Sequence, residues 1–168
     1  MSYRSITLRL TIYFAAASIA VLLTIGYLVG NAVEKHFIEL DRIELRGKME
    51  LVRHVLRKTR TDADVEALRE RMEDALTGHE SLLVSLATPE GHTLFKTSGA
   101  MFPPALLETR APDDPDSTPD LTPWEQHEHV YRGFVAVVPT EAAAIPKVVV
   151  AIAVATDEHH KFMVVLNR

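Results

Sequence analysis

The chain has 168 residues, of which 47% are hydrophobic and 24% charged, and its formal net charge is −5. This length suffices for one modest domain, and the acidic balance argues against a nucleic-acid partner. Because the chain contains no cysteine, a disulfide framework and a thiolate metal site are both excluded.

An uncharged apolar run covers residues 10–33 and predicts a transmembrane helix. Arg4 and Arg9 precede it without an acidic residue, so the positive-inside rule places residues 1–9 in the cytoplasm and the rest of the chain outside. A cleaved signal peptide is the alternative, but such a peptide has a shorter apolar stretch and a small-residue cleavage site. We therefore expect an uncleaved anchor, followed by an outer domain over residues 34–161.

The outer domain is expected to begin with two helices. Apolar residues at helical spacing predict one helix over residues 34–58, which continues directly out of the membrane, and a second over residues 62–77. Thr61 or Asp62 is suited to cap the second helix, and Gly78 is suited to end it.

The pattern then changes to that of strands. Four short strands are predicted, at residues 82–87, 93–96, 130–138 and 147–155. Residues 103–128 hold most of the nine prolines and several acids, which indicates an acidic, proline-rich solvated loop. The elements together predict an α+β fold, in which long helices pack on a small antiparallel sheet.

The last residues of the chain are apolar again. A helix is expected to start near Asp157 and to run into residues 162–168. In a chain that already has one anchor, this ending is typical of a second transmembrane helix that is truncated after its first turns. A short core helix at a natural terminus is the alternative.

Histidine is frequent, with eight in the chain. His36 follows the first apolar run by three residues, and His159 and His160 precede the second run. If both runs cross the membrane, these imidazoles lie at the same height beside the lipid and can share a metal ion. A solvated histidine pair that caps a helix is the alternative for His159 and His160.

Two carboxylates lie near His36 in the sequence. Glu39 shares its helix face, whereas Asp41 is about 140° around the helix at 100° per residue. Asp41 would therefore join His36 only through another chain or a local distortion. A hydrated helix face is the alternative for both acids.

Two further groups of side chains have a second interpretation. His127 and His129 form a His-x-His, which on an extended segment directs both rings to one side and would make a secondary metal site; a polar loop edge is the alternative. Phe37, Leu40 and Ile43 belong either to the core or to a seam against a second copy of the same helix.

Several segments in order along the chain carry a family resemblance. They are residues 9–11 (RLT), 33–41 (VEKHFIELD), 47–54 (GKMELVRH), 75–79 (ALTGH), 90–95 (EGHTLF), 131–133 (YRG) and 157–160 (DEHH). With them the chain resembles the sensor region of heavy-metal sensor histidine kinases, of the type that regulates copper/silver or cobalt/zinc/cadmium efflux.

This resemblance implies a homodimeric receptor of the bacterial inner membrane with a PAS-like (PDC-type) sensor domain in the periplasm. It implies that metal binds near the dimer interface, close to the membrane. His36 and Phe37 match the interface motif, His159 or His160 the second ligand, and Asp41 the acid of the zinc type. The loop over residues 103–128 contains no methionine, so imidazole and carboxylate leave both Cu(I)/Ag(I) and Zn(II) open.

The chain contains no catalytic motif of a kinase. The resemblance places ATP-dependent autophosphorylation, and contact with a cytoplasmic response regulator, in a kinase half that this sequence lacks. Two other functions remain open from the sequence: a sensor of the same fold that binds a small organic ligand in its core, and a membrane-anchored structural module that binds a partner through the acidic loop.

Overall fold

The computed structural model describes residues 3–79, 81–111, 120–126 and 129–156. The chain divides into two units, Met1–Glu39 and Leu40–Arg168. The first unit is part of helix α1 (Tyr3–Arg57), as the apolar run over residues 10–33 predicts. Among the described residues, α1 alone has a stretch long and apolar enough to cross a membrane, and none of that stretch is buried.

In the second unit, the end of α1 is followed by two short helices. These are α2 (Asp62–Glu66) and α3 (Leu68–Leu76), so the single helix predicted over residues 62–77 is divided at Ala67. Thr61 caps α2 and Gly78 follows α3 with a φ of 83°, as expected for a residue that ends a helix.

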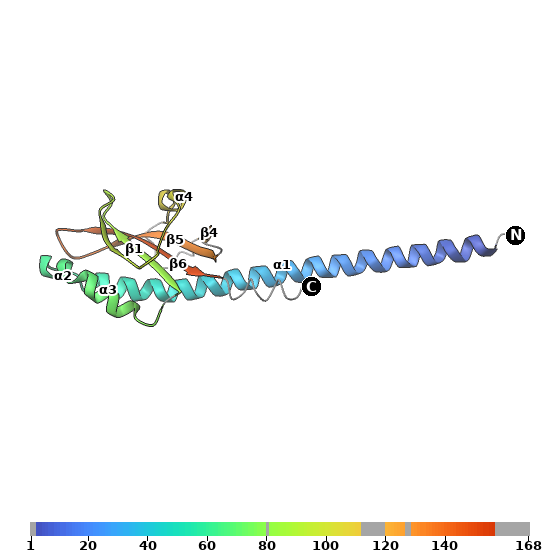
Figure 1. The fold of residues 1–168 in the computed structure, drawn as a ribbon, viewed down its shortest axis with the longest axis horizontal. Coiled ribbons are helices and arrows are strands. Elements are labelled where there is room, and N and C mark those ends of the chain that lie inside the picture. Colours follow the sequence, from blue (N-terminus) through green and yellow to red (C-terminus); the bar gives the residue numbers. More distant parts are fainter. Residues whose placement is uncertain (1–2, 80, 112–119, 127–128, 157–168) are drawn as a thin grey trace. The chain divides into compact units, whose positions relative to one another are not determined.

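The strands form one sheet, which is six-stranded within the described part of the chain. They are β1 (Leu82–Ala87), β2 (Thr93–Lys96), β3 (Arg110–Ala111), β4 (Thr122–Gln126), β5 (His129–Pro139) and β6 (Lys147–Ala155). The order is β2-β1-β6-β5-β3, with β4 also paired to β5 (Figure 1). Every pairing is antiparallel except that of β3 with β5. The predicted α+β fold and its four strands are confirmed.

The structure differs from the expected loop over residues 103–128 at both ends of that segment. Helix α4 (Pro104–Glu108) and β3 lie at its beginning, and β4 lies near its end. The prolines are compatible with these elements, because Pro104 stands in the first turn of α4 and Pro123 lies on a strand with a single partner in the described sheet. Composition alone gave no signal for any of these three elements.

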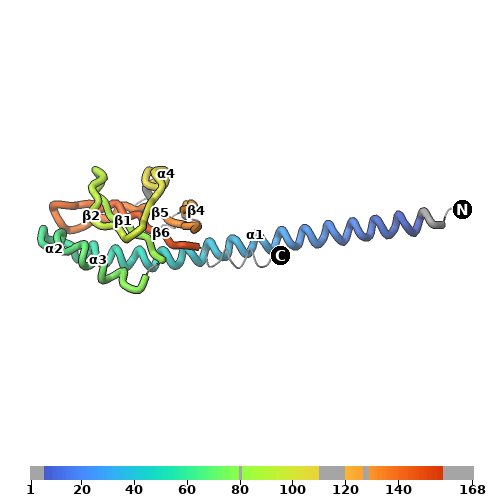
Figure 2. Tube along the Cα trace, in the orientation of Figure 1, coloured from blue at the N-terminus to red at the C-terminus, as the bar shows by residue number. Residues whose placement is uncertain are grey.

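Alternating residues of the sheet build two apolar layers. Phe134 on β5 and Ile152 on β6 belong to the main core, together with buried side chains of α1 and α3. Val135 and Ala151, one position later and earlier, pack with Leu106 of α4 on the other face. The sheet is therefore covered on both faces, and the tube view shows α1 and α3 on one side and α4 on the other (Figure 2).

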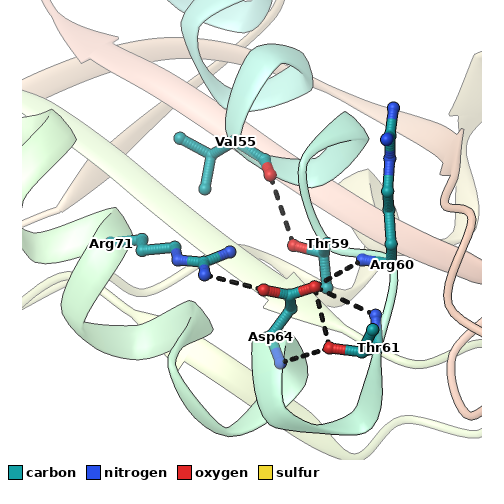
Figure 3. A network of polar contacts seen from close by, with 6 residues as sticks. All are labelled: Val55, Thr59, Arg60, Thr61, Asp64 and Arg71. Carbon is teal, nitrogen blue, oxygen red and sulfur yellow. Dashed lines mark hydrogen bonds and ion pairs between the residues drawn. The ribbon is translucent and has the colours of Figure 1, made fainter.

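The start of α2 is held by a network around the Asp64 carboxylate (Figure 3). This carboxylate accepts hydrogen bonds from the backbone N–H groups of Arg60 (3.1 Å) and Thr61 (3.0 Å) and from the Arg71 guanidinium (2.7 Å). The bond from Arg60, followed by that from Arg71, holds the pKa of Asp64 well below its ordinary value of 3.8. Thr61 completes a capping box with Asp64.

We predict that Asp64→Asn weakens the dependence of stability on acid pH. A depressed pKa in the folded state stabilises the protein above the unfolded-state pKa, and that contribution is lost as the pH falls through the folded-state pKa. Urea unfolding in detergent micelles, followed by fluorescence of the single tryptophan, measures the effect in both proteins below about pH 4. Equal losses of stability in the two proteins on acidification would show that the network does not act in this way.

Candidate functional site

The end of α1 that lies in the second unit buries one stripe of side chains. Its members, spaced three or four residues apart, are Asp41, Leu45, Met49, Val52 and Leu56, and each residue as a whole is no more than 4% exposed. This spacing places all five on one helix face, and the four apolar members join the main core beneath the sheet. The stripe therefore begins with a carboxylate, which is an unusual group to bury.

Asp41 is balanced by Arg132 of β5. The Arg132 Nη1 atom donates to Asp41 Oδ2 at 2.6 Å, and the two side chains are 20% and 5% exposed. Strand alternation explains the contact, because Arg132 lies on the same face of β5 as the core residue Phe134. A short, charge-assisted hydrogen bond thus joins the helix to the central part of the sheet.

Arg132 was not predicted to be a site residue, and it entered the sequence comparison only as part of the matching YRG segment. A signal was nevertheless present, since Arg132 occupies an inward position of a strand whose other inward positions are apolar, and Asp41 occupies the first position of an apolar helical stripe. Two opposite charges at core positions indicate a buried pair.

Strand β6 ends beside the part of β5 that contains Arg132. Arg132 is the register partner of Val154, and Thr156 donates from its backbone N–H (2.7 Å) and its hydroxyl (2.9 Å) to the carbonyl of Val130. Thr156, the last described residue, is therefore bonded to β5 at Val130, two residues before the arginine that binds Asp41. His159 and His160 lie outside the described residues.

The other predicted residues on α1 are exposed, except Phe37, which is half-buried. His36 and Glu39 belong to the unit Met1–Glu39, where the ring of His36 lies 6.4 Å from that of Phe37, centroid to centroid. In the second unit, Leu40 is 43% and Ile43 61% exposed, whereas Asp41 beside them is buried. The core of the chain therefore does not include Leu40 and Ile43.

His129 lies on the opposite face of the sheet from Arg132. It is the exposed first residue of β5, and its ring is 6.4 Å from that of Tyr131, which itself stacks on Trp124 at 5.8 Å. The structure therefore separates His129 from Asp41 by the thickness of the sheet. His127 lies outside the described residues.

These contacts decide which of the predicted ligands is open to a metal ion. The Asp41 carboxylate, as it stands, is bound by a guanidinium and is not open to a cation, whereas the imidazole of His36 is exposed. Among the residues that the structure describes, no three histidine, aspartate or glutamate side chains are placed to hold one ion.

Comparison with known proteins assigns the family. Residues 3–163 match the family model described as CusS sensor domain, so the chain belongs to that family. The fold is also similar to that of a crystal structure described as the CusS sensor domain with silver bound, with a TM-score of 0.51 and 22% identity over 76% of this chain and 96% of that one.

Relatives from two bacteria show the same similarity. The probable sensor protein PcoS of Escherichia coli is 27% identical over 95% of this chain, and the sensor protein CzcS of Cupriavidus metallidurans is 30% identical over 62% of it. The chain covers 34% of the length of PcoS and 21% of that of CzcS, so it corresponds to a part of each.

We predict that Asp41→Asn and Arg132→Gln each lower the free energy of unfolding by about 2–3 kcal/mol, because each breaks a largely buried, charge-assisted hydrogen bond. The double variant should lose less than the sum of the two. Urea unfolding, monitored by Trp124 fluorescence, gives the free energy of unfolding of wild type, both single variants and the double variant, and thus the coupling energy between the two residues.

The matched control is Glu141→Gln, which removes the exposed ion pair with Arg60. Those side chains are 61% and 67% exposed, so the expected change is below about 0.5 kcal/mol. Strictly additive effects of the two buried variants would contradict a direct interaction between Asp41 and Arg132.

Proposed function

We propose that the chain is the metal-sensing input region of a two-component sensor histidine kinase, which detects copper or silver, or else zinc, cadmium or cobalt, in the bacterial periplasm. Family membership over residues 3–163 is the observation that carries this proposal. The silver in the described structure of a relative's sensor domain supports a metal ion as the ligand. The exposed apolar stretch of α1 supports a location in the inner membrane.

In this proposal the ion is bound by His36 together with His159 or His160. Imidazole nitrogen suits Cu(I), Ag(I) and Zn(II) alike. The contact between Asp41 and Arg132 supports the arrangement: His36 precedes Asp41 by five residues, and the histidine pair follows Thr156 by three and four. Asp41 itself can become a ligand only when Arg132 releases it.

The receptor is proposed to act as a homodimer. Phe37, Leu40 and Ile43 form its seam, and the exposure of Leu40 and Ile43 supports this role, since neither contributes to the core of one protomer. Glu39, His127 and His129 are secondary candidates for metal binding. The exposed position of His129, on the far face of the sheet from Asp41, would make it part of a separate site.

Metal binding can transmit a signal only if the ion prefers one arrangement of the helices over another. An ion shared between α1 and the residues that follow β6 would favour the arrangement in which these segments meet. A kinase half beyond this chain would convert that preference into autophosphorylation with ATP and transfer to a response regulator.

We predict that His36→Ala weakens binding of Ag(I), Cu(I) or Zn(II) by at least about tenfold, because it removes a directly coordinating nitrogen. Calorimetric titration of the 168-residue chain in detergent micelles measures the affinity. Sedimentation of the same samples should show that the wild-type chain dimerises when metal is added and that the variant does not.

The matched control is His54→Ala, which removes another exposed histidine from the same helix. Its affinity should stay within about twofold of wild type, which is the scatter expected for a substitution away from the site. Equal affinities of wild type and His36→Ala would remove His36 from the site.

A further inference from the structure

Arg132 is a cation on the apolar, helix-facing side of a central strand. The positions that follow on that face of β5 are Phe134, Ala136 and Val138, and all three are buried in the main core. The Arg132 side chain is only 20% exposed. A guanidinium in such a place needs an anionic partner, and Asp41 is the partner that the structure provides at 2.6 Å.

Asp41 depends on the arginine in the same way. Its side chain is 5% exposed, and it lies at the start of a helical stripe that is otherwise apolar. A carboxylate that is buried and bound by a guanidinium is a poor metal ligand, because the cation must first displace the arginine. Displacement leaves the guanidinium largely buried without its counter-ion.

The metals in question differ in their need for oxygen ligands. Cu(I) and Ag(I) are soft ions with little preference for carboxylate, whereas Zn(II) completes a four-ligand shell readily with a carboxylate oxygen. The state of Asp41 therefore affects these two groups of ions unequally. Soft ions lose nothing when the carboxylate is occupied, whereas Zn(II) gains the carboxylate as a ligand only by displacing Arg132, which weakens its binding.

We propose that Arg132 is a specificity-determining residue, which withholds the Asp41 carboxylate from the sensed ion and so favours soft monovalent ions over Zn(II). The proposal rests on the metal-sensing function proposed above. It is an indirect role, because Arg132 acts on the ion through Asp41 and makes no contact with it.

The experiment compares Zn(II) and Ag(I) affinities of the 168-residue chain in detergent micelles, for wild type and Arg132→Gln. Removing the guanidinium from Asp41 should tighten Zn(II) binding by about tenfold or more, the factor that corresponds to one charge-assisted hydrogen bond, and leave Ag(I) within about twofold. Saturating Zn(II) should also raise the Tm of Arg132→Gln more than that of wild type, because it replaces the missing counter-ion.

Two further variants separate the carboxylate from other effects. Adding Asp41→Asn to Arg132→Gln should abolish the gain in Zn(II) affinity, and Arg132→Lys, which keeps the cation, should remain closer to wild type than to Arg132→Gln. The proposal is overturned if Arg132→Gln changes both metals alike, if it changes neither, or if the gain survives the second substitution.

A measurement on the unaltered protein keeps the test decisive if Arg132→Gln does not fold. Nitrogen NMR of the Arg132 guanidinium should show its hydrogen bond intact with saturating Ag(I) and broken with saturating Zn(II). An identical guanidinium spectrum with both ions overturns the proposal. If the wild-type chain binds neither metal, the proposed function is wrong. If it binds both metals through His36, and the ratio of their affinities is the same with and without Arg132, only the role of Arg132 is wrong.

Discussion

The contact between Asp41 and Arg132 is the interaction on which the arrangement of this domain depends. The apolar members of the stripe on α1, such as Leu45 and Met49, stabilise packing against the sheet but tolerate small shifts along the helix, because burial of apolar surface is not directional. A buried ion pair of 2.6 Å has one geometry. It therefore fixes the position of one end of the stripe against β5, and this is the end nearest in sequence to His36.

This contact also connects the start of the second unit with the end of β6. Arg132 lies opposite Val154, and two residues later Thr156 is held by the carbonyl of Val130. A displacement of α1 against β5 would thus shift the end of β6, and a displacement at the end of β6 would shift Asp41. In the function proposed here, this mechanical link is the route by which an ion near the membrane acts on the packing of the domain.

Most of the fold could be predicted from the sequence, because valine-rich strands and an amphipathic helix leave strong local patterns. The strands at residues 82–87 and 147–155 are confirmed at their predicted bounds, and Gly78 adopts the positive φ expected of a residue that ends a helix. The break at Ala67 and the strand at residues 122–126 were missed. Strand β4 depends on tertiary contacts, since it is specified by its pairing with β5 rather than by its own composition, whereas the division at Ala67 is slight because this residue keeps a helical backbone conformation.

The candidate site was less predictable, because its elements come from distant parts of the chain. Asp41 was considered as a carboxylate near His36 and matched the acid of the zinc type by family resemblance, but its partner Arg132 was missed although both charges occupy core positions of regular patterns. Imidazole nitrogen NMR of the chain in lipid nanodiscs tests whether His36 and the pair His159/His160 bind the same ion, through silver–nitrogen coupling after one equivalent of Ag(I) is added. Coupling is expected at His36 and also at either His159 or His160. Coupling confined to His36, coupling confined to the pair, or no coupling would rule out a shared ion.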